Sequence, residues 1–66
     1  MSYHITRIHF KKQNLSFSER EKFINEEILK QIQSFKQKNL YTQSYEVLNK
    51  TSSFFSVRFN LINLEK

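Results

Sequence analysis

The chain has 66 residues and a net charge of +5 at neutral pH, and it contains no cysteine, glycine or proline. A chain this short forms a single domain, 1–66, that buries only about 60% of its extended surface, so its stability is marginal. The lack of cysteine excludes disulfides and thiolate metal sites, and we therefore expect a homodimer to supply the missing stability.

The first predicted element is a strand over residues 3–12, YHITRIHFKK, which is rich in β-branched and aromatic side chains. After the connection QNLSFS, a helix is predicted from about Phe17 to Leu40. Its apolar stripe is formed by residues at helical spacing, namely Ile24, Ile28, Ile32 and Phe35, with Leu29 widening it.

The ends of this helix carry recognisable signals. Ser16 with Glu19, and Ser18 with Glu21, both fit the Ser-x-x-Glu capping box that satisfies free backbone N–H groups. Asn39 is the best available substitute for a C-cap glycine, so we expect the helix to end near it.

Two further strands are predicted over residues 43–49 and from Phe54 to Leu64. The intervening NKTSS predicts a turn, in which Asn49 is the residue most tolerant of a positive φ. A helical crossover makes the first two strands parallel, and the hairpin makes the third antiparallel to the second.

These elements predict an α+β fold, a small β-α-β-β domain with a three-stranded sheet in the order 1-3-2. The third strand is apolar on both faces, which favours a central position over an edge. One long helix can cover one face of this sheet. We expect it to pack on Ile8, Phe10, Tyr45, Val47, Phe55, Val57, Phe59 and Leu61.

The second sheet face is then left with a mixed surface, apolar at its margins and charged in its middle. Its apolar residues are predicted to form an interface, either with a second copy or with another protein: Tyr3, Ile5, Leu48, Phe54 and Ile62.

The sequence argues against most catalysis. Aspartate is absent, and four of the six glutamates fall on the helix, where capping and pairs such as Glu26 with Lys30 account for them. Without glycine there is no phosphate-binding glycine loop. His4 and His9 are five residues apart and face opposite sides of a strand, so they cannot share a metal. We expect a non-catalytic protein without cofactor or metal.

The basic surplus lies outside the helix. Residues 17–40 hold five basic and four acidic side chains, so nearly all of the net +5 is carried by strands and loops. Such a surplus attracts phosphate-bearing partners, here nucleic acid or a nucleotide-type ligand. The alternative is that the charge serves only solubility.

The predicted topology brings several phosphate-binding groups to one end of the sheet, beside the helix N-terminus. These are Lys11, Lys12, Ser16, Ser18, Lys50 and Thr51. Arg7 and Arg58 on the sheet face are reserve candidates, because guanidinium both pairs with phosphate and stacks on bases.

Two function classes remain. The first is a small basic protein that binds an anionic partner; the second is a protein inhibitor of a host enzyme or defence component. Glycine, proline and alanine, whose codons are GC-rich, are absent, whereas Lys, Asn, Ile and Phe, whose codons are AT-rich, are abundant. This composition indicates an AT-rich gene, as in a phage or mobile element of a low-GC bacterium. With no apolar run of about 18 residues and no signal-peptide core, we expect no membrane partner and a place in the cytoplasm of the bacterial host cell.

Overall fold

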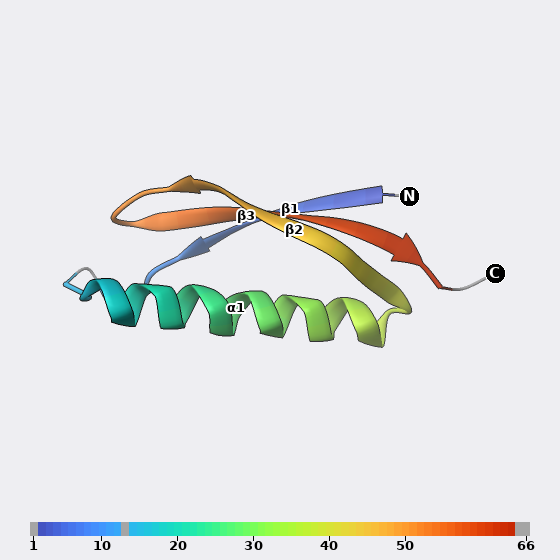
Figure 1. Cartoon of the computed structure of the whole chain (residues 1–66), viewed down its shortest axis with the longest axis horizontal. Helices are drawn as coiled ribbons and strands as arrows, with labels where there is room; N and C mark the ends of the chain where they lie inside the picture. Colours follow the sequence, from blue (N-terminus) through green and yellow to red (C-terminus); the bar gives the residue numbers. More distant parts are fainter. Residues whose placement is uncertain (1, 13, 65–66) are drawn as a thin grey trace.

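The computed structural model describes residues 2–12 and 14–64 and contains four elements (Figure 1). In chain order they are β1 (Ser2–His9), α1 (Phe17–Gln37), β2 (Leu40–Lys50) and β3 (Phe54–Asn63). The predicted β-α-β-β order and the α+β class are confirmed.

The sheet has the predicted strand order β1-β3-β2, with β3 in the centre. β3 is antiparallel to both neighbours, so β1 and β2 run in the same direction. The β1–β3 register is continuous, from Ser2 opposite Leu61 to His9 opposite Phe54. The β2–β3 register shifts twice, between Thr42 and Ser44 and between Val47 and Lys50, as bulges do.

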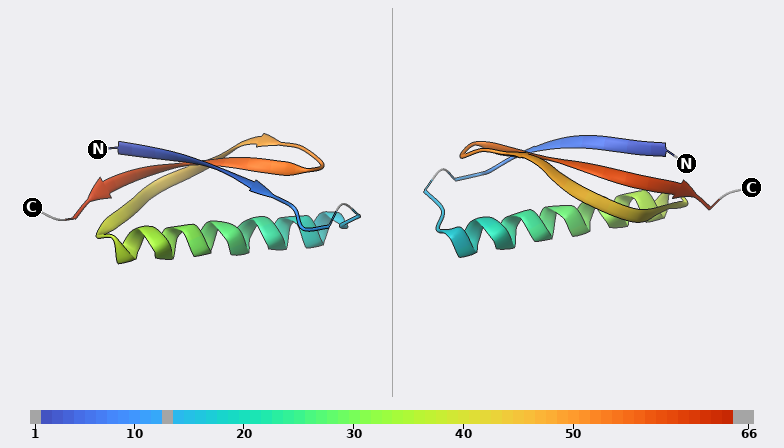
Figure 2. Two further views of the ribbon diagram at one scale, coloured as in Figure 1. Left: turned by 180° about the vertical axis from the view of Figure 1, so that it is seen from behind. Right: turned by 45° about the horizontal axis from the view of Figure 1, so that its top comes forward.

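The helix lies along one face of the sheet and leaves the other face uncovered (Figures 1 and 2). The core is formed between them, where Phe55, Val57 and Phe59 of β3 have no exposed surface. Phe35 of α1 contacts Phe59 with ring centres 5.2 Å apart, and Phe10 contacts Phe55 at 5.4 Å. The predicted helix-covered face is thus confirmed, although Tyr45, at the β2 edge, stays half exposed.

The predicted helix stripe is too wide. Leu29 is exposed, whereas Ile24, Ile28 and Phe35 are buried. Each residue turns the helix by about 100°, so Leu29 lies that far around the axis from Ile28 and points away from the sheet.

The helix is also shorter than predicted, because it ends at Gln37 with Lys38 as its C-cap. Asn39 has a φ of 62° and turns the chain into β2, which confirms its predicted role. β2 starts at Leu40, three residues before the predicted boundary, and β1 ends at His9 rather than at residue 12.

The prediction for Asn49 is wrong, since Asn39 is the one residue with positive φ in the described part of the chain. A hydroxyl organises the β2–β3 turn instead. Thr51 Oγ1 accepts hydrogen bonds from the backbone N–H of Ser53 (3.2 Å) and Phe54 (3.0 Å), and donates one to the Phe54 carbonyl (3.0 Å). This arrangement needs no left-handed residue.

Candidate nucleic-acid interface

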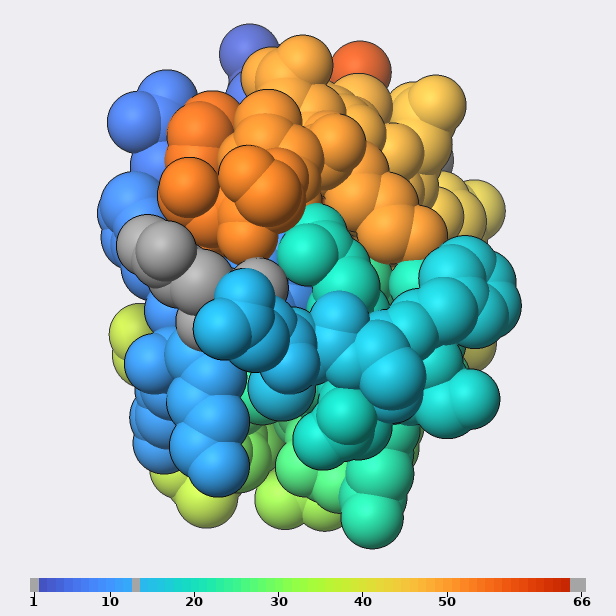
Figure 3. Space-filling model, turned by 90° about the vertical axis from the view of Figure 1, so that its left-hand side faces the viewer, coloured from blue at the N-terminus to red at the C-terminus, as the bar shows by residue number. Residues whose placement is uncertain are grey.

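One end of the molecule gathers the segments that the sequence predicted to meet there. The chain after β1, the start of α1 and the β2–β3 turn lie side by side in the end view (Figure 3). The question is whether the predicted phosphate-binding groups at this end are free to bind a ligand.

The helix N-terminus is already capped by its own side chains. Ser16 Oγ accepts a hydrogen bond from the Glu19 backbone N–H (3.2 Å), and Glu19 Oε1 accepts one from the Ser16 N–H (3.1 Å). Of the two predicted capping boxes, this one forms. The bonds from the Ser16 backbone and side chain lower the pKa of Glu19, so a carboxylate occupies the positive end of the helix. Ser18 lies in the first turn and is exposed.

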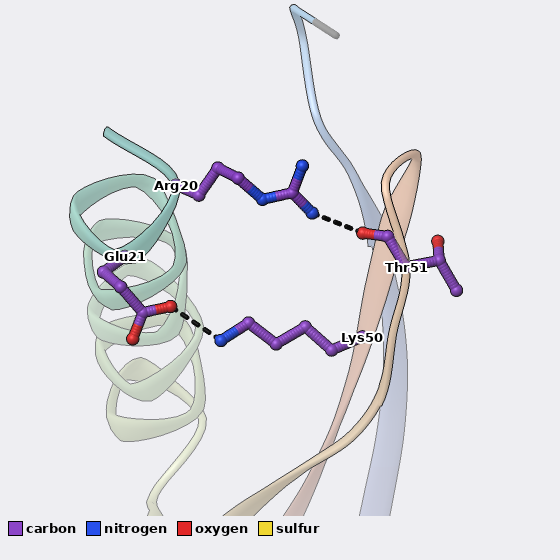
Figure 4. Close-up of polar contacts among 4 residues, drawn as sticks. All are labelled: Arg20, Glu21, Lys50 and Thr51. Carbon is purple, nitrogen blue, oxygen red and sulfur yellow. Dashed lines mark hydrogen bonds and ion pairs between the residues drawn. The ribbon is translucent and has the colours of Figure 1, made fainter. Parts of the chain in front are cut away.

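The hairpin groups are also engaged within the chain (Figure 4). Lys50 Nζ donates to Glu21 Oε2 at 2.7 Å, which forms an ion pair between hairpin and helix. Arg20 Nη2 donates to the Thr51 carbonyl at 2.5 Å. Arg20 was not predicted from the sequence, because its partner is 31 residues away in the chain. The hydroxyl of Thr51 closes the turn and Lys50 is paired with Glu21, so a phosphate bound at either would compete with a contact within the chain.

Lys11 and Lys12 are exposed at a different place from Lys50. They line an open groove together with Lys22 and the apolar side chains of Leu15 and Phe23. Two carboxylates, of Glu19 and Glu26, line the same groove, and Lys50 is not part of it. The structure therefore does not bring the three predicted lysines into one cluster.

The uncovered sheet face, called the open face below, is defined by the register. Paired residues of neighbouring strands point to the same side, and alternate residues of a strand point to opposite sides. Because Phe55, Val57 and Phe59 point to the helix, the open face comprises Tyr3, Ile5, Arg7, His9, Tyr41, Ser44, Glu46, Phe54, Ser56, Arg58, Asn60 and Ile62.

Two arginines of the open face are stacked on aromatic rings. The guanidinium carbon of Arg58 lies 4.7 Å from the ring centre of Tyr3, and that of Arg7 lies 4.7 Å from the ring centre of Phe54. The His9 ring lies beside Phe54 at 5.8 Å. Stacking fixes each guanidinium over a ring while the N–H groups at its rim stay able to bind phosphate.

The predicted interface residues share this surface. Tyr3 and Ile5 of β1 are 62% and 52% exposed, and Phe54 and Ile62 of β3 are half-buried. Leu48 lies at the second bulge of β2 and is exposed. Tyr41, which was not predicted from the sequence, also lies here; it pairs with Ile62 and is 55% exposed. If β2 had been predicted to start at Leu40, the alternation of its side chains between the two sheet faces would have placed Tyr41 on the open face.

The two histidines lie on opposite faces, as predicted. His4 contacts Phe35 of the helix at 5.4 Å, and His9 contacts Phe54 on the open face. No group of three or more potential metal ligands occurs in residues 2–12 and 14–64. Lys30 pairs with Glu27 at 2.8 Å rather than with the predicted Glu26, and this bond raises the pKa of Lys30.

No helix in the described chain combines the length and apolarity needed to cross a membrane. No family model matches the chain, and the comparisons with curated proteins and with solved structures find no match either.

Proposed function

We propose that this protein is a non-catalytic binding protein that holds single-stranded nucleic acid on its open face. The observation that carries the proposal is the pair of arginines, Arg58 and Arg7, each stacked on an aromatic ring of that face. Exposed aromatic rings and guanidinium planes on a sheet are surfaces on which unpaired bases stack, while arginine N–H groups bind the phosphates.

The positions of the two stacks favour a strand of several nucleotides over a single nucleotide. Tyr3 is opposite Asn60, so along β3 it lies six residues from Phe54. At about 3.3 Å per residue, the two rings are roughly 20 Å apart along the sheet. A mononucleotide contacts one stack, whereas a longer strand reaches both.

The charges of the open face support the same partner. Arg7 and Arg58 outnumber its one carboxylate, that of Glu46, which lies opposite Arg58 in the register. The ion pair and hydrogen bonds at the hairpin and helix end leave these two arginines as better phosphate ligands than Lys50. Arg7 and Arg58, predicted from the sequence as reserve candidates, are therefore the centre of the proposed nucleic-acid site.

The proposal predicts how affinity depends on length and salt. We expect a fluorescein-labelled single strand of about 12 nucleotides to bind at least tenfold more tightly than a dinucleotide, since each stacked base contributes about 1–3 kcal/mol. Two phosphate contacts should give a log–log salt slope of about −1.4 or steeper. Fluorescence anisotropy measures both, with a duplex of equal length as the control.

The second candidate is a protein-directed inhibitor that uses the same face, of a host enzyme or a defence component in the bacterial cytoplasm. It is supported by the exposed apolar side chains of Tyr3, Ile5 and Tyr41. Absence of nucleic-acid binding even at low salt would favour this candidate. Both candidates are compatible with an origin in a phage or mobile element.

A further inference from the structure

The backbone of β1 offers a free pairing edge. The Phe10 N–H donates to the Ser53 carbonyl at 3.0 Å, which continues the β1–β3 register by one residue. Because hydrogen-bonded pairs alternate in an antiparallel ladder, the even-numbered residues of β1 bond to β3. Tyr3, Ile5, Arg7 and His9 therefore direct their N–H and C=O groups away from the sheet.

This edge lacks the bulges, lysines and prolines by which many proteins prevent edge-to-edge pairing, and Arg7 is its one arginine or lysine. β1 is continuous in register over all eight residues and contains neither lysine nor proline. The opposite edge differs, because two register shifts interrupt β2 and Lys50 ends it. The two edges of the same sheet are thus unequal, and only that of β1 is open to an added strand.

The sequence of β1 is complementary to itself in one antiparallel register. Residues facing each other must lie on the same sheet face, so the two-fold axis passes midway between one residue and the same residue of the second copy. An axis at Arg7 places the Arg7 side chains of the two copies directly opposite each other, where they repel. An axis at Thr6 places the same two arginines on a diagonal, still within reach of each other. An axis at His4 leaves fewer backbone hydrogen bonds between the two strands than an axis at Ile5. An axis at Ile5 pairs two exposed isoleucines and sets each Tyr3 opposite an Arg7.

We infer that β1 pairs antiparallel with β1 of a second copy, with Ile5 opposite Ile5 across a two-fold axis. About six backbone hydrogen bonds then join the chains. The result is a six-stranded sheet with both helices on one side and two adjoining open faces on the other. This dimer does not depend on nucleic-acid binding, and it gives the marginal domain a partner without covering its open face.

Two matched substitutions test the inference by mass in solution. Ile5 and Tyr41 are 52% and 55% exposed and lie on opposite edges of the sheet. We expect sedimentation at about tens of micromolar to give a wild-type mass of twice 8.1 kDa. Ile5→Lys should weaken dimerisation at least tenfold, and Tyr41→Lys should leave it unchanged. A wild-type monomer, or equal effects of both substitutions, would overturn the inference.

Single cysteines test the register on a chain that has none of its own. Facing residues of a hydrogen-bonded pair have Cα atoms about 5.5 Å apart, within the range of a disulfide. Thr6 and its copy are offset by two residues and lie more than about 7 Å apart. Ile5→Cys should therefore crosslink on mild oxidation, and Thr6→Cys and Tyr41→Cys should not. Crosslinking at Tyr41, or at Thr6 in preference to Ile5, would contradict this pairing, even if Ile5→Lys failed to fold.

Discussion

Phe59→Ala should destabilise the chain strongly, lowering its free energy of unfolding by about 3–5 kcal/mol. Phe59 has no exposed surface and packs its ring against Phe35 of the helix and Tyr45 of β2, at ring-centre distances of 5.2 and 6.3 Å. Truncation of a buried phenylalanine costs about 3–5 kcal/mol. A chain of 66 residues has a stability of about 3–10 kcal/mol, so the loss consumes much or all of it.

The matched control is Phe17→Ala, at the start of the helix, where the ring is 75% exposed. The same chemical change there should alter the free energy of unfolding by about 0.5 kcal/mol or less. Urea denaturation followed by circular dichroism compares the two variants. Similar midpoints for both would show that β3 is not the centre of the core.

Removal of the two open-face arginines should have the largest effect on nucleic-acid binding. In Arg7→Gln/Arg58→Gln, each ring loses its stacked guanidinium and the face loses two positive charges. We expect affinity for a 12-nucleotide single strand to fall at least tenfold and the log–log salt slope to become shallower by about 1.4. Fluorescence anisotropy over a salt series measures both quantities.

Two controls change the net charge by the same amount. Lys36→Gln/Lys38→Gln removes two charges at the C-terminal end of α1 and should have little effect on binding. Lys11→Gln/Lys12→Gln removes two charges at the groove beside the helix N-terminus. An equal loss in all three doubles would mean attraction by diffuse charge. A loss of affinity confined to Lys11→Gln/Lys12→Gln would show that nucleic acid binds at the groove beside the helix N-terminus and not on the open face.

The central position of β3 could be predicted from the sequence because Phe54 and Ile62 make it apolar on the face opposite Phe55 and Phe59. A strand that is apolar on both faces is unfavourable at the edge of a sheet, so β3 is expected between β1 and β2. Asn39 was predictable as well, because asparagine is the residue best able to replace glycine at a positive φ.

The state of the helix end could not be predicted in the same way. Lys50 and Glu21 are separated by 29 residues, and their ion pair depends on where the helix lies relative to the hairpin. The turn could close through the Thr51 hydroxyl or through a left-handed Asn49, and local preference does not decide between them. The surplus of basic residues and its location could be predicted from the sequence. The ion pair between Lys50 and Glu21, which neutralises part of that surplus, could not.

The arginines of the open face show the same limit. Alternation along β1 and β3 places Arg7 and Arg58 on one face, and the sequence analysis named both. Their stacking partners, Phe54 and Tyr3, depend on the register of two strands that are joined through β2 and the helix. A shift of β1 by one residue against β3 would turn Tyr3 and Arg7 to the helix face and separate them from Arg58 and Phe54.

The most direct test of single-strand binding on the open face is a titration of isotope-labelled protein with a 12-nucleotide single strand, followed by backbone amide chemical shifts. We expect the shifts to concentrate at Tyr3, Arg7, Phe54 and Arg58, and the amides of Ile24 and Ile28 on the helix to stay unchanged. Shifts confined to Lys11, Lys12 and the first turn of α1, with β1 and β3 unaffected, would contradict binding on the open face.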